Sequence, residues 1–155
     1  MSESTSETKL MAAIGVLSRE QAQEVVERAV KLSKADAVRV SVNSSRETNL
    51  RFADNQMSTS GVTTNSTIRI QSVFGKRKAS VVTNDRSDDG LRRAIAQSEA
   101  LARLAPEDPE YLGELPPQTY VPVNAWFDRT ADLSAEDRAT AAMTALAPAR
   151  AAKDL

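Results

Sequence analysis

The hydrophobic period changes twice along this chain, and this change limits the possible folds more than any other feature. Within residues 18–34, apolar side chains recur at helical spacing, at Ala22, Val25, Val26 and Ala29. Between residues 38 and 83 they alternate with polar ones, as half-buried strands require. Helical spacing returns after residue 87. A run of strands bounded by helices is typical of an α+β fold.

The strand region predicts an antiparallel sheet of about four strands. The alternating runs cover residues 38–42, 50–52, 64–72 and 78–83. Residues 43–46 are of the turn type and separate the first two runs. Gly75 accepts a positive φ, which makes residues 74–77 a tight hairpin. Strands joined by such short links must be antiparallel.

Three helices are predicted around the sheet. Ser18 and Gln21 form a capping box that starts the first, which ends near Lys34. The second starts near Ser87 with an inner stripe of Leu91, Ala94, Ile95, Ser98 and Ala102, and it stops before Pro106. Ser134 opens a third, Ala-rich helix with Ala139, Ala142, Met143 and Leu146 on one face, which Pro148 ends or kinks.

The chain divides into four predicted segments. Residues 1–16 form a disordered tail, and residues 17–106 form the α+β domain. Residues 107–133 form a proline-rich connector, since five of the six prolines lie between residues 106 and 122. Residues 134–155 form the Ala-rich helix, whose apolar face needs a cover. It either leads into a missing C-terminal domain or packs back on the sheet.

The composition excludes several kinds of catalytic centre. The chain has no histidine and no cysteine, so Cys/His zinc sites and Ser-His-Asp or Cys-His nucleophile systems are ruled out. Its five glycines are isolated, so it has no phosphate-binding loop. Asp85, Asp88 and Asp89 are the densest acidic cluster, but a charged helix start explains them better than a metal site. The carboxylates of Glu107 and Asp108 fit a solvated connector better than an acid/base pair.

Charge and hydropathy give expectations about partners and location. The net charge is −1, with no basic excess, so we expect no nucleic-acid partner. The basic hairpin tip at residues 76–78 is the exception, and solvated side chains explain it. No apolar run approaches the roughly 18 residues of a membrane helix, and the run at residues 10–17 lacks the basic flank of a signal peptide. We expect a cytoplasmic protein that does not bind membranes.

Three segments together resemble the N-terminal domain of the TldD/PmbA (TldE) family of metallopeptidases. The first is R-F-A-D-N-Q at residues 51–56, followed by Ser58 and Ser60. The second is T-N-D at residues 83–85, ahead of a helix, and the third is the helix exit L-A-R-L-A-P-E-D-P at residues 101–109. They occur in the family's order, and the resemblance covers about residues 17–155.

The resemblance implies a larger parent protein whose C-terminal part carries the peptidase centre. In TldD-type members this centre is H-E-x-x-x-H with a later cysteine that completes a zinc site, whereas PmbA-type members lack it and pair with a TldD-type subunit. The present chain has no such motif, so no catalytic residue and no metal ligand is assigned to it. Zinc is expected only in the missing C-terminal domain of a TldD-type parent. The implied partners are a TldD/PmbA-type subunit or a second copy, and a peptide substrate.

The polar residues of the first two motifs form the candidate surface for substrate or partner: Arg51, Asn55, Ser58, Ser60, Thr83 and Asn84. A sheet edge binds extended peptides through backbone hydrogen bonds with little sequence preference. The alternative is that these residues fix local structure, with Asn55 in a turn and Asn84 and Asp85 capping the following helix. Both interpretations stay open.

Three functions are compatible with these observations. The first is the non-catalytic N-terminal portion of a TldD/PmbA-type peptidase, which degrades unfolded peptides as a full-length protein. This portion would help dimerisation or substrate access. The second is a stand-alone binding or scaffold domain without peptidase activity. The third is a nucleic-acid contact domain that uses residues 76–78, and the sequence pI of about 5.6 argues against it.

Overall fold

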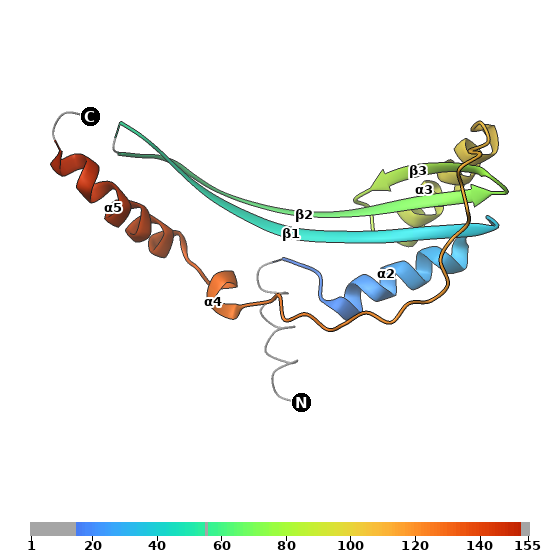
Figure 1. Ribbon diagram of the computed structural model, residues 1–155, viewed down its shortest axis with the longest axis horizontal. Helices are drawn as coiled ribbons and strands as arrows, with labels where there is room; N and C mark the ends of the chain where they lie inside the picture. The colour runs from blue at the N-terminus through green and yellow to red at the C-terminus, as the bar shows by residue number, and fades with distance from the viewer. Residues whose placement is uncertain (1–14, 55, 153–155) are drawn as a thin grey trace. The chain divides into compact units, whose positions relative to one another are not determined.

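The structure is a computed structural model, and it describes residues 15–54 and 56–152. Figure 1 shows its elements. In chain order they are α2 (Arg19–Leu32), β1 (Ala37–Ala53), β2 (Gln56–Phe74), β3 (Arg77–Thr83), α3 (Asp88–Leu104), α4 (Asp128–Ala131) and α5 (Ala135–Ala151). The predicted tail, residues 1–16, lies outside the described part except for Gly15 and Val16.

The chain forms two compact units, each made of two stretches of sequence. The first unit combines Met1–Ser45 with Thr64–Tyr120, and the second combines Arg46–Thr63 with Val121–Leu155. The strands β1 and β2 therefore contribute to both units. We call residues 46–63, which comprise the end of β1, the turn and the start of β2, the distal hairpin. The predicted segment boundaries near residues 106 and 133 stay predictions.

The α+β fold is confirmed, but the sheet has three strands rather than about four, in the order β1-β2-β3. The predicted turn at residues 43–46 does not exist, because β1 continues through it as one strand of 17 residues. The physical reason is that these residues are polar but include neither glycine nor proline, and a two-stranded ribbon accepts polar side chains on its exposed faces.

The tight hairpin at residues 74–77 is confirmed. Antiparallel pairing of β2 with β3 runs from Ile68 opposite Thr83 to Phe74 opposite Arg77. Gly75 sits in the turn with a φ of 59°, which costs a glycine little. Asp54, in the turn between β1 and β2, also has a positive φ, of 50°. Aspartate is one of the few other residues that tolerate this conformation.

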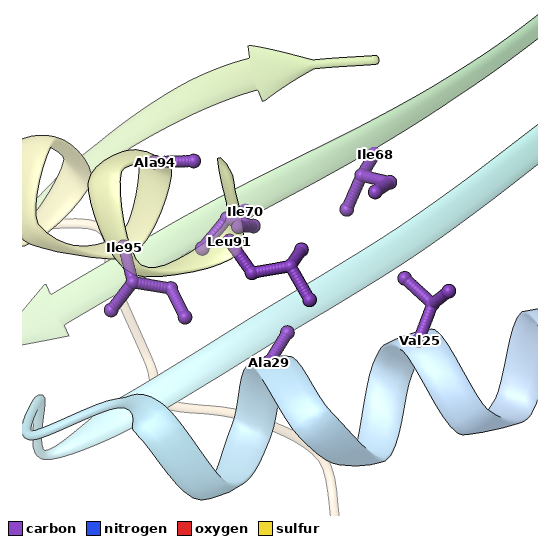
Figure 2. Packing of buried hydrophobic residues seen from close by; sticks show 7 residues of the cluster. All are labelled: Val25, Ala29, Ile68, Ile70, Leu91, Ala94 and Ile95. Carbon is purple, nitrogen blue, oxygen red and sulfur yellow. The ribbon is translucent and has the colours of Figure 1, made fainter. Parts of the chain in front are cut away.

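The core of the first unit lies between the sheet and the two helices α2 and α3. Figure 2 shows its buried side chains, which come from α2, β2 and α3: Val25, Ala29, Ile68, Ile70, Leu91, Ala94 and Ile95. Val38, Val40 and Val42 of β1 pack against them. The predicted inner stripe of α3 is thus confirmed. Each of the larger side chains contributes about 1.5–3 kcal/mol by leaving water.

Polar contacts fix the ends of these two helices. The capping box of Ser18 and Gln21 is confirmed at the start of α2, and Ser87 caps α3 by accepting a hydrogen bond from the amide of Gly90. At the end of α2, the amide of Lys34 donates to Glu99 Oε1 of α3 at 2.6 Å. One serine pair is fully buried, with Ser72 Oγ on β2 lying 2.6 Å from Ser98 Oγ on α3.

The second unit contains the distal hairpin and the helices α4 and α5. A capping box of Ser134 and Asp137 starts α5. The predicted inner face is confirmed by burial, since Leu146 is 7% exposed and Ala139, Ala142 and Met143 are half-buried. Pro148 lies inside the helix and does not end it. In the described ranges, no helix is both long and apolar enough to cross a bilayer.

Candidate binding surfaces

The face of the sheet that points away from α2 and α3 carries a polar hollow. Since side chains alternate along a strand, residues next to the core valines and isoleucines point to this outer face. Five of them, from all three strands, line a hollow of about 140 Å³: Arg39, Ser41, Arg69, Gln71 and Ser80. Every lining side chain can donate a hydrogen bond, and none is a carboxylate. The hollow is therefore suited to an anion.

The connector after α3 docks on the same sheet through ion pairs. Glu107 lies 3.4 Å from Arg77, and its backbone pairs with that residue as an antiparallel bridge. Asp108 lies 2.6 Å from Lys78 Nζ, and its hydrogen bond from Lys78 lowers the pKa of the carboxyl group. The basic hairpin tip and the acidic connector, which the sequence indicated to be solvated, thus bind each other.

The connector also reaches Arg39, at the rim of the hollow. Glu114 Oε2 lies 2.5 Å from Arg39 Nη2, and this hydrogen bond raises the pKa of the guanidinium. The Tyr111 ring lies 5.4 Å from Lys78 Nζ, a cation–π distance, and Tyr111 Oη donates to Glu114 Oε1 at 3.3 Å. Loss of water contact raises the pKa of the Tyr111 phenol, and Glu114 adds to this effect.

Arg69 has no such partner. It is exposed on β2, in the middle strand, and within the described ranges it forms no ion pair or side-chain hydrogen bond. Neighbouring Gln71 donates to Ser80 Oγ at 3.3 Å across the strands. The hollow therefore contains one guanidinium bound to Glu114 and one that is available to a ligand. The alternation of apolar and polar residues along β1 and β2 places Arg39 and Arg69 opposite the core, but it gives no sign of the connector beside them.

The predicted surface residues fall on both units. Arg51, Ser58 and Ser60 are exposed on the distal hairpin, where Ser60 Oγ donates to the backbone oxygen of Asn49 at 3.4 Å. Asn55 lies outside the described residues. Thr83 and Asn84 lie in the first unit, at the junction of β3 and α3.

At that junction the hydrogen bonds serve the helix start. Thr83 Oγ1 accepts from the amide of Asp85 at 3.1 Å, and Asp85 Oδ1 accepts from the amide and the hydroxyl of Ser87. These bonds from Ser87 lower the pKa of Asp85, and Arg93 adds to the effect. Asn84 is exposed.

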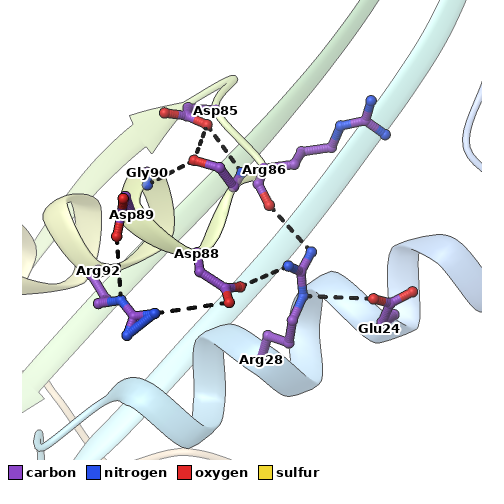
Figure 3. A network of polar contacts seen from close by, with 9 residues as sticks. Glu24, Arg28, Asp85, Arg86, Asp88, Asp89, Gly90 and Arg92 are labelled. Atoms are coloured by element: carbon purple, nitrogen blue, oxygen red, sulfur yellow. Dashed lines mark hydrogen bonds and ion pairs between the residues drawn. The ribbon is translucent and has the colours of Figure 1, made fainter.

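The acidic cluster at the start of α3 is bound to arginines (Figure 3). Asp88 Oδ1 lies 2.8 Å from Arg28 Nη1 of α2, and Asp89 lies 3.7 Å from Arg92. In the part of the chain that the structure describes, no three histidine, cysteine or acidic side chains are placed to hold a metal ion. The zinc that the family resemblance implies is expected in another part of the parent protein, and it stays an expectation.

Comparison with known proteins agrees with the fold and the earlier resemblance. Residues 38–102 match the family model for PmbA/TldA metallopeptidase domain 1. This stretch is therefore similar to the first domain of PmbA/TldA metallopeptidases. The fold matches the crystal structure of TldE from Thermococcus kodakarensis with a TM-score of 0.72, at 17% identity over 85% of this chain. No curated protein matches.

The matched TldE chain is much longer than this chain. The chain spans 29% of the matched TldE chain. At 17% identity the match establishes a shared fold alone, and the activity of a whole protein remains a proposal.

Proposed function

We propose that this chain is the non-catalytic first portion of a PmbA/TldD-type metallopeptidase assembly, and that its distal hairpin contacts the partner subunit or an extended peptide. One observation carries the proposal. The pairing of β2 with β3 covers only residues 68–74 of β2, so among the described strands the rest of β2 has β1 alone as a neighbour. Both edges of that ribbon leave backbone N–H and C=O groups free for another chain.

The side chains of the distal hairpin support the same function. Three large apolar side chains are about half exposed, namely Phe52 at 55%, Met57 at 44% and Val62 at 53%. A ribbon of two strands is only marginally stable in water. A partner that pairs with an edge and covers these side chains would therefore stabilise it. The proposed partner is a TldD/PmbA-type subunit or a second copy of this chain. The proposed location is the cytoplasm.

The test measures association and amide exchange together. The chain is studied by analytical ultracentrifugation, alone and mixed with a PmbA/TldD-type subunit. Hydrogen exchange then reports which amides become protected. We expect a complex in which amides of residues 46–63 gain protection. A double variant, Phe52→Ser with Met57→Ser, should weaken the complex by about tenfold or more, because truncated apolar anchors dominate interface energies.

The matched control is Leu115→Ser, since Leu115 is 82% exposed on the connector. It should leave the association unchanged. If the chain stays monomeric in both samples and the hairpin amides exchange at the same rate, the proposal is wrong, and the stand-alone scaffold becomes the better interpretation. Sequencing the gene past Leu155 adds a second check, since a downstream H-E-x-x-x-H motif would mark a metal-bearing parent.

A further inference from the structure

The outer face of the sheet already binds an extended acidic segment, namely the connector of this chain. Two of its carboxylates, Asp108 and Glu114, pair with Lys78 and Arg39 on this face. The amide of Asp108 also donates to the backbone oxygen of Lys76 at 2.9 Å. The sheet therefore recognises an acidic chain by charge and by backbone hydrogen bonds together.

The polar hollow extends this recognition surface beyond the connector. Arg69 supplies a guanidinium with no partner among the described residues, and Ser41, Gln71 and Ser80 supply hydroxyl and amide groups around it. A guanidinium binds a carboxylate through two parallel hydrogen bonds, which are stronger than those between neutral groups. Among the described residues, no carboxylate lines the hollow to compete for Arg69.

We propose that this hollow is a binding site for a carboxylate of an extended acidic peptide, with Arg69 as the anchor. Arg39 becomes a second anchor when Glu114 leaves it. A peptide is favoured over a free anion because the neighbouring basic groups are occupied by carboxylates on an extended chain. The site lies wholly in the first unit and does not depend on the distal hairpin, so it goes beyond the function proposed above.

The experiment titrates the chain into a fluorescent peptide of about eight residues, alternating serine and glutamate, and measures anisotropy at low salt. A second peptide has glutamine in place of glutamate. We expect the acidic peptide to bind and the glutamine peptide to bind at least about tenfold more weakly. Binding should weaken as salt is raised, because exposed charges are screened.

Two variants give opposite expected results. Arg69→Gln should weaken acidic-peptide binding by about five- to tenfold, since it removes the anchor. Glu114→Gln should strengthen it by about two- to fivefold, because it releases Arg39 from an exposed ion pair. A gain of affinity cannot arise from misfolding. Arg19→Gln is the matched control, because Arg19 is exposed on α2, and it should change nothing.

Three outcomes would overturn the site. One is equal binding of both peptides, and another is an Arg69→Gln variant that binds like Arg19→Gln. The third is competition in which inorganic phosphate or acetate displaces the peptide at equal concentration, which would show a site for small anions only. The Phe52→Ser and Met57→Ser double variant should bind the acidic peptide normally. This separates failure of the site from failure of the hairpin function.

Discussion

The two ends of the β1–β2 hairpin follow different rules, although the same two strands form both. At the first unit, the inward residues of β2, Ile68 and Ile70, are fully buried, and Arg69 between them is exposed. In the distal hairpin, every described residue from 47 to 63 is exposed except Leu50 and Gly61, which are half-buried. The difference shows that the fold needs only one end of the hairpin for its core, and that the other end is available for contacts.

The largest loss of stability is expected from a substitution in the core of the first unit. Leu91→Ala removes a fully buried side chain of α3 and leaves a cavity, so it should lower the free energy of unfolding by about 2–5 kcal/mol. Urea denaturation followed by circular dichroism measures this. Phe52→Ala on the distal hairpin should cost less than about 0.5 kcal/mol. Equal losses of unfolding free energy in the two variants would contradict the distinction between the first unit and the distal hairpin.

A smaller effect is expected at the buried serine pair. Ser98→Ala leaves the hydroxyl of Ser72 without its partner in a buried place, which should cost about 1–3 kcal/mol. The double variant, Ser72→Ala with Ser98→Ala, removes both groups and should recover much of that loss. Comparison of the unfolding free energies of the wild type, both single variants and the double variant measures the coupling. Additive losses would show that the two hydroxyls act independently.

The smallest effect concerns pH and the start of α3. The hydrogen bonds from Ser87 hold the pKa of Asp85 below the usual range of an aspartate. In acid the unfolded chain therefore binds a proton at this position before the folded chain does, and stability falls as pH drops through that interval. Between about pH 5 and pH 2, the wild type should lose stability more steeply than Asp85→Asn. Parallel curves from urea titrations would rule out this contribution.

Much of the first unit could be predicted from the sequence, because interactions between neighbouring residues determine it. The capping box at Ser18, the hairpin at Gly75 and the inner stripe of α3 are each set by side chains a few residues apart, so they can be identified in the sequence. The strand number was wrong at residues 43–46. A signal was present, because the apolar positions Val42 and Leu50 are both even, which keeps one face through the polar stretch.

The outer face was not predictable to the same degree. Its partners lie far apart in the chain, with Arg39 bound to Glu114 and Lys78 bound to Asp108. Spacing rules describe neighbours along a strand or helix, and they say nothing about where a proline-rich connector returns. The spacing of the apolar residues predicted which face of α5 is buried. It did not predict which residues cover that face.

The interleaving of the two units has a consequence during synthesis. All residues of the first unit have been made once the ribosome reaches residue 120, whereas the second unit needs the early distal hairpin and the later residues from 121 onward. Chains fold from the N-terminal side as they emerge. The nascent chain therefore exposes a ribbon with open edges and apolar side chains while the remainder is being translated.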